Sequence, residues 1–167
     1  MSYKNLSTAR EFYNKFEFDF SNLKTEKESV EYDACTFQLN GKSIIHRSSK
    51  ITPTKTGQFV TIWNRNENGQ TEPFHINDNF DLIIISSRNG DLFGQFIFPK
   101  SVLIKKGIIS SDKKQGKRGI RVYPTWDLTI NKQAQKTQQW QTEYFVEILE
   151  DSVGKVRTLI AVQASVK

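Results

Sequence analysis

The sequence predicts an α+β fold, in which helices flank a central mixed β-sheet within one domain that spans residues 1–167. A chain of 167 residues can bury a real core as a single domain, and 12% of its residues are aromatic. Helical spacing of apolar residues marks the N-terminal region 1–33 and a region near 131–149. Residues 34–123 instead show short apolar runs separated by turn residues, which are typical of a sheet.

The N-terminal region begins with a predicted helix over residues 8–20. Thr8 and Glu11 have the spacing of a capping box, in which each side chain bonds a free backbone amide of the first turn. Apolar aromatic residues recur every four positions from Phe12 onward, which indicates one buried stripe. A second T-x-x-E pattern predicts a short helix over 25–32.

Six strands are predicted in the sheet region. Asn40-Gly41 favours a two-residue hairpin because both residues tolerate positive φ. The run from Leu82 to Ile85 is continuously apolar, which indicates a central strand covered on both faces. The predicted strands cover residues 36–39, 42–47, 58–63, 82–85, 92–98 and 119–123.

The remaining elements are two helices and a last strand. Residues 101–106 are predicted to form a short helix that ends at Gly107, since glycine favours the left-handed cap. Apolar spacing predicts a long helix over about 131–149, rich in glutamine. The β-branched segment at about 156–162 predicts a C-terminal strand.

Positive charge is concentrated in one segment, residues 100–121, which holds eight Lys or Arg side chains and one acid. Its net charge of +7 exceeds the +6 of the whole chain. Residues 42–65 are a second basic stretch, with five cations and no acid. Such localised charge indicates a polyanionic partner, most simply the phosphates of nucleic acid.

We therefore predict nucleic-acid binding by both basic stretches, with neighbouring aromatic rings that stack on bases. If the fold brings the stretches together, they form one positive face. The turn Gly116-Lys117-Arg118-Gly119 resembles one that grips phosphate, since glycines let the backbone approach an anion. Trp63 is predicted to be a core residue of its strand. The predicted binding residues are Arg47, Lys50, Lys55, Lys100, Lys117, Arg118, Arg121, Tyr123 and Trp126.

Other features limit the class of protein. Two histidines and the single Cys35 cannot supply the four N or S ligands of a structural zinc site, so no metal site is predicted. The lone cysteine excludes an intrachain disulfide and favours a reducing compartment. The longest apolar run is far too short to cross a bilayer, and the first residues lack the apolar core of a signal peptide. We expect a cytoplasmic protein that needs neither a membrane nor a cofactor.

Four strings resemble the MepB family, a bacterial family named for a gene beside a multidrug efflux pump and its repressor. They are RSSKITPTKTGQFVTIWNR (47–65), GQFIFPKSVLIKKGII (94–109), GKRGIRVYPTWD (116–127) and NKQAQKTQQWQTEYF (131–145). The resemblance covers about residues 30 to 150 and includes both basic stretches. It implies a bacterial cytoplasmic protein, with a link to a multidrug resistance operon.

Two alternative functions stay open. The order of elements also looks like the restriction-endonuclease-like fold, which implies an Mg²⁺-dependent nuclease with Asp81, Gln95 and Lys100 as candidate catalytic residues. Gln95-Phe96-Ile97 stands where that fold usually has an acid-x-Lys, so the match is incomplete. The third hypothesis is a binder of small phosphorylated ligands, with the same cations lining a pocket.

Overall fold

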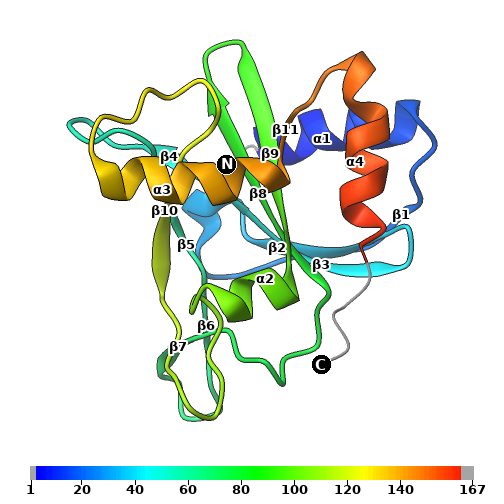
Figure 1. Cartoon of the computed structure of the whole chain (residues 1–167). Coiled ribbons are helices and arrows are strands. Elements are labelled where there is room, and N and C mark those ends of the chain that lie inside the picture. Colours follow the sequence, from blue (N-terminus) through cyan, green and yellow to red (C-terminus); the bar gives the residue numbers. More distant parts are fainter. Residues whose placement is uncertain (1–2, 163–167) are drawn as a thin grey trace.

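A six-stranded mixed sheet separates two layers of the molecule in the computed structural model, which describes residues 3–162 (Figure 1). The strand order is β1-β2-β3-β8-β9-β11, and β3 and β8 run parallel while the other pairs are antiparallel. Two smaller sheets have the orders β10-β5-β4 and β6-β7. The α+β prediction is therefore confirmed. The strands are β1 Phe20–Thr25, β2 Cys35–Leu39, β3 Lys42–Ser48, β4 Lys50–Ile51, β5 Gln58–Thr61, β6 Trp63–Arg65, β7 Thr71–Pro73, β8 Leu82–Asn89, β9 Leu92–Pro99, β10 Gly119–Val122 and β11 Phe145–Glu147.

Four α-helices and three 3-10 turns complete the described chain. The longest helix, α1, has 12 residues, and no helix within residues 3–162 is long and apolar enough to cross a membrane. The helices are α1 Lys4–Lys15, α2 Lys100–Lys105, α3 Lys132–Gln141 and α4 Val153–Ile160; the turns are η1 Val30–Tyr32, η2 Thr142–Tyr144 and η3 Glu150–Ser152.

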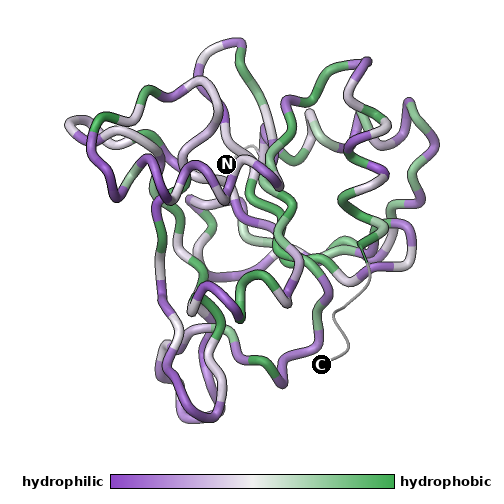
Figure 2. Tube along the Cα trace, viewed as in Figure 1, coloured by the Kyte–Doolittle hydropathy of each residue, from purple (hydrophilic) through white to green (hydrophobic). Residues whose placement is uncertain are grey.

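Strand β8 is the centre of the core. Leu82 and Ile84 belong to the apolar cluster on one face of the sheet, and Ile83 and Ile85 belong to the cluster on the other. The continuous apolar run that predicted a doubly covered strand is thus confirmed, and Figure 2 shows the green, apolar trace running through the middle of the molecule. The predicted hairpin at Asn40-Gly41 is also confirmed, with both residues at positive φ.

Helices α1 and α4 cover one face of the large sheet (Figure 1). Helix α1 begins at Lys4, so Thr8 lies inside it and its hydroxyl donates to the Lys4 carbonyl, which makes the predicted capping box wrong. The predicted C-terminal strand is also wrong. Val156, Leu159 and Ile160 follow helical spacing and are buried in the core cluster of this face.

The predictions for 25–32 and 131–149 are wrong in part. Residues 20–25 form β1, because they pair with the edge of β2, and only η1 follows. Helix α3 ends at Gln141, since Phe145 and its neighbours leave the helix to pair with β9 as strand β11. The ring of Phe145 occupies the space over Gly94, where a Cβ would lie 2.3 Å from its Cζ.

A buried polar network crosses the large sheet. The Tyr13 hydroxyl donates to Gln95 Oε1 at 2.8 Å, and the Gln95 amide donates to Ser86 Oγ at 3.0 Å. His46 Nδ1 lies 3.1 Å from the Asp33 carbonyl and its Nε2 lies 2.8 Å from Ser86 Oγ. Because a carbonyl only accepts, Nδ1 holds the proton and Nε2 accepts from Ser86. Burial lowers the pKa of His46 to about 4, so the ring is neutral.

Candidate nucleic-acid interface

The two basic stretches of the sequence lie side by side in the three-stranded sheet. Strand β10 pairs with β5 along Gly119–Val122, and β5 pairs in turn with β4. The register aligns Lys50, Phe59 and Arg121 in one row across the three strands. Residues opposite one another in a sheet share a face, so the row joins a cation from each stretch to an aromatic ring.

Arg121 also ties the loop before β5 to β10. Its guanidinium donates to the Thr52 hydroxyl at 2.6 Å, the Gly57 carbonyl at 3.1 Å and the Thr56 carbonyl at 3.2 Å. The main role of Arg121 is therefore to hold the basic loop in place. Its guanidinium adds positive charge to this surface at a fixed position.

A groove of about 500 Å³ opens between β10, α3 and the end of α2. Lys106, Lys117 and Arg121 supply positive charge to its lining. Lys106 and Lys117 are exposed, and Lys106 Nζ lies 5.1 Å from the centroid of the Trp140 ring. The aromatic lining consists of Phe59, Tyr123 and Trp140, and the polar lining includes Asn131, Gln133 and Thr137. The groove thus combines cations with rings, as a surface that binds phosphates and bases requires.

The glutamines of α3 have separate roles, and two of them, Gln133 and Gln141, line the groove. The side-chain amide of Gln141 satisfies two backbone groups at the end of β10. Its Oε1 accepts from the Tyr123 amide at 2.9 Å, and its Nε2 donates to the Arg121 carbonyl at 3.0 Å. Gln138 donates to the Pro124 and Asp127 carbonyls and so fixes the loop that enters the helix. Gln133 is exposed in the lining, so its side-chain amide is accessible to a ligand.

The structure separates the predicted binding residues into groups. Lys117, Arg121 and Tyr123 line the groove. Lys50 and Lys55 are exposed on the neighbouring strand and loop. Arg118 is exposed but bonded to Thr71.

Three predicted binding residues lie elsewhere. Trp126 packs edge-on against Phe145, with centroids 5.4 Å apart and a buried Nε1, so it is no stacking platform. Lys100 donates to the Asp78 carbonyl and lies over the Phe80 ring, outside the groove lining. Arg47 is 4% exposed and lines a different pocket.

The glycine-bracketed turn at 116–119 does not present a nest of free amides. The Gly116 amide donates to Ser110 Oγ at 2.7 Å, and the Lys117 amide donates to the Ile108 carbonyl at 2.9 Å. Gly116 serves close packing instead, since a Cβ there would lie 2.3 Å from the Ile108 carbonyl oxygen. The side chains of Lys117 and Arg118, both exposed, are therefore the parts of this turn that can contact an anion most readily.

Sequence reasoning did not assign Lys106, Phe59 and Trp140 to the interface. Lys106 directly precedes the helix-ending Gly107, and helix α2 places it facing Trp140. Trp140 follows the helical stripe of α3, which indicates a core residue, but it is only partly buried. The position of Lys106 within the basic segment 100–121 is the feature of the sequence that could have assigned it to the interface.

The structure brings together two of the three candidate nuclease residues and leaves the third apart. Asp81 Oδ2 accepts from the Ser43 amide at 2.8 Å, at the start of β8. Gln95 is fully buried beneath α1 and pairs with Ser86 of β8. Ser86 lies five residues after Asp81, which places it about 16 Å from Asp81 along the strand. Within residues 3–162, no group of three or more His, Cys, Asp or Glu side chains is arranged to hold a metal ion. Asp81 and Lys100 are neighbours, since the Lys100 amide donates to the Asp81 carbonyl at 3.1 Å, whereas Gln95 lies apart from both.

Comparison with known proteins identifies similar chains. A family model described as MepB-like matches residues 26–147. A crystal structure of MepB is 34% identical, with a TM-score of 0.76, over 84% of this chain and 95% of that chain. A bacterial homing endonuclease is 16% identical with a TM-score of 0.45, over 92% of each chain, a similarity too low to support an inference. No curated protein sequence matches significantly.

Proposed function

This chain belongs to the MepB-like family, and we propose that it binds nucleic acid through the groove between β10 and α3. The observation that supports this most is the pairing of β5 with β10. It puts the two most basic stretches of the sequence into one sheet, beside a groove lined by cations and aromatic rings.

The charge distribution favours a polymer of phosphates over a single anion. Lys50 and Lys55 lie outside the groove on the neighbouring strand and loop, and Lys106 and Lys117 lie in it. All four are exposed, and none of them forms an ion pair with a carboxylate within the described residues. A chain of phosphates can contact several such cations at once and release a counterion at each.

Tyr123 is the ring best placed to meet a base. It is partly exposed and lines the groove, and Gly57 leaves room for its ring. Stacking of one base on such a ring contributes about 1–3 kcal/mol to affinity and tolerates any base. Binding through phosphates and stacking would therefore show little sequence preference.

The cytoplasm is the compartment in which we expect this binding. Cys35 is a buried free thiol, and burial raises its pKa to about 12, so it is unreactive and compatible with a reducing environment. The proposal requires no cofactor.

Fluorescence anisotropy with labelled single-stranded DNA, duplex DNA and RNA tests the proposal. We expect micromolar or tighter binding at low salt, with an affinity that falls steeply as salt increases. A series of oligonucleotide lengths separates this proposal from the binding of small phosphorylated ligands in the same groove. Affinity that rises with length supports a polymer, whereas equal binding of mononucleotides and long strands supports the small ligand. Undetectable binding of every polymer at low salt would refute the proposal.

A further inference from the structure

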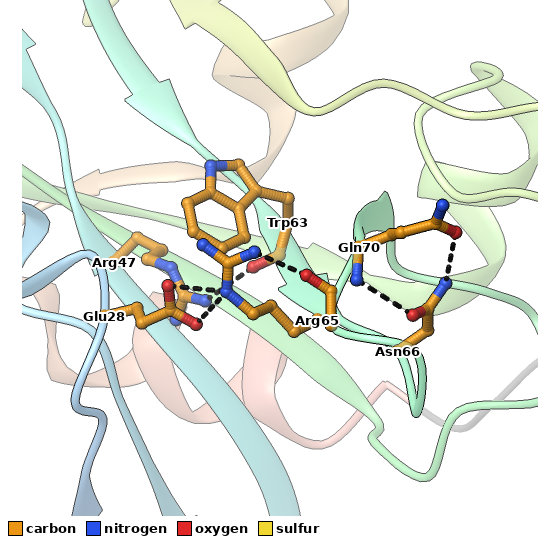
Figure 3. Close-up of polar contacts among 7 residues, drawn as sticks. Glu28, Arg47, Trp63, Arg65, Asn66 and Gln70 are labelled. Carbon is orange, nitrogen blue, oxygen red and sulfur yellow. Dashed lines mark hydrogen bonds and ion pairs between the residues drawn. The ribbon is translucent and has the colours of Figure 1, made fainter.

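Arg47 lies in a second pocket, of about 640 Å³, between the chain after β1, strand β6 and the segment that follows β7. Its side chain is 4% exposed. The guanidinium donates to the His46 carbonyl at 2.9 Å and to the Trp63 carbonyl at 3.4 Å, while Nε has no hydrogen-bond partner (Figure 3). Within residues 3–162 no carboxylate lies within ion-pair distance of Arg47.

A buried cation without a counterion is costly. Removal of a charge from water costs several kcal/mol even after relaxation, unless a partner compensates it. Burial lowers the pKa of Arg47, and Glu26 is the strongest influence in the opposite direction. Two carbonyls and the Phe74 ring, whose centroid lies 5.7 Å from Arg47 Cζ, compensate this charge only in part, which leaves a place for an anion from outside the chain.

Arg65, a second cation of this pocket, is already occupied. Arg65 Nε lies 2.7 Å from both carboxylate oxygens of Glu28, and Arg65 Nη1 donates to the Gly69 carbonyl (Figure 3). This ion pair lies at the rim, where both side chains are 45% exposed. Lys27 is exposed at the rim, so Arg47 is the buried cation that remains for a ligand.

The pocket also has a flat wall and an unused acceptor. Trp63, predicted to be a core residue, is only partly buried and lines the pocket. Asn64 Oδ1 is buried without a partner. Phe74 and Phe80 add apolar surface. A planar ring with an N–H or O–H donor would match these three features.

The overall charge of the pocket limits the ligand further. Three acids and three cations line it: Glu26, Glu28 and Asp78, with Lys27, Arg47 and Arg65. A polyanion would meet as many like charges as opposite ones, in contrast to the groove. The site therefore favours a ligand with a single anionic group.

We propose that this pocket binds a small compound with one carboxylate or phosphate group on a planar ring. The anion pairs with Arg47, the ring lies against Trp63, and a donor of the ring bonds Asn64 Oδ1. The pocket shares no lining residue with the groove, so this proposal is independent of the proposed function. Both a free ring carboxylate and a nucleoside monophosphate have this chemistry.

Isothermal titration calorimetry on the full chain tests the proposal with four probes: adenosine 5′-monophosphate, 4-hydroxybenzoate, adenosine and inorganic phosphate. We expect the monophosphate, 4-hydroxybenzoate or both to bind at least about tenfold more tightly than adenosine or phosphate. Preference for the monophosphate indicates a nucleotide, and preference for 4-hydroxybenzoate indicates a ring carboxylate. Absence of binding of both at millimolar concentration would overturn the proposal.

Three variants locate the site. Arg47→Met removes the charge but keeps the length of the side chain. We expect it to lower the affinity for the preferred probe at least about tenfold. Asn64→Ala, at a partly exposed position, should lower the affinity for the same probe without loss of the preference for anionic probes. This variant remains informative if Arg47→Met fails to fold. Lys117→Gln, in the groove, should leave the affinity for the probe unchanged. Equal binding to wild type and to the folded Arg47 or Asn64 variant, or loss in the Lys117 variant, would contradict the assignment.

Discussion

The guanidinium of Arg121 donates a hydrogen bond of 2.6 Å to the hydroxyl of Thr52, 69 residues earlier in the chain. The bond connects β10 to the loop that follows β4. Through it and its neighbouring bonds, a residue of one basic stretch fixes the conformation of the other. Specific hydrogen bonds of the fold therefore hold the two basic stretches next to each other.

Replacement of Arg121 should loosen this loop. In Arg121→Ala the hydrogen bonds to residues 52–57 are lost, so we expect trypsin to cleave after Lys55 faster than in the wild type. Mass spectrometry of a timed digest measures the rate. Lys136→Ala, an exposed change on α3, is the control. An unchanged rate at Lys55 would show that Arg121 does not hold the loop.

Trp126 should matter for stability and not for binding. Its ring packs against Phe145, so Trp126→Ala should lower the free energy of unfolding by about 3 kcal/mol. Urea denaturation measures this loss, and anisotropy on the folded variant should show wild-type affinity for nucleic acid.

Tyr123→Leu is the matching change in the groove. It keeps apolar bulk over Gly57 but removes the flat ring, so affinity should fall by about 1–3 kcal/mol with little change in stability. If Trp126→Ala instead weakened binding while Tyr123→Leu did not, the assignment of the stacking ring would be wrong.

His46 should make stability depend on pH. Its pKa is about 4 in the folded protein and ordinarily 6.5, so the unfolded chain binds the proton more readily. The contribution is complete above about pH 6.5 and is lost as pH falls toward 4, by about 3 kcal/mol in total. Urea denaturation across this range should show the loss in the wild type. His46→Gln removes the titrating group, so its stability should fall less; parallel curves for the two proteins would contradict the assignment.

Gly94 should be intolerant of any side chain. A Cβ would meet Phe145 Cζ at 2.3 Å and the Val146 carbonyl oxygen at 2.8 Å, so Gly94→Ala should displace β11 and cost about 1–3 kcal/mol. Hydrogen exchange at residues 145–147 should rise. Gly154→Ala is the control, because a Cβ there meets nothing within 4 Å and α4 gains a better helix former. Equal exchange in both variants would refute the role of Gly94.

Local patterns in the sequence predicted the elements whose cause is local. The Asn40-Gly41 hairpin, the apolar strand at Leu82 and the glycine that ends α2 all follow from residues next to one another. The charge pattern likewise predicted which segments form the basic face.

Elements set by distant contacts were not predictable in this way. The segment around Val156 is β-branched, yet the apolar cluster under α1 selects a helix. Strand β11 exists because Phe145 fits over Gly94. Burial of Arg47 and Trp126 depends in the same way on strands and loops far away in sequence, so neither could be assigned from its neighbours.

The central claim is that cations of the groove bind nucleic acid. The most direct test compares Lys106→Gln/Lys117→Gln with Lys4→Gln/Lys155→Gln, which removes the same charge from exposed positions on α1 and α4. The measurement is the slope of log affinity against log salt for a labelled oligonucleotide. We predict that the groove variant reduces the magnitude of the slope by about 1.5 and weakens binding, while the control variant keeps the wild-type slope. Equal slopes for the two double variants would contradict the claim.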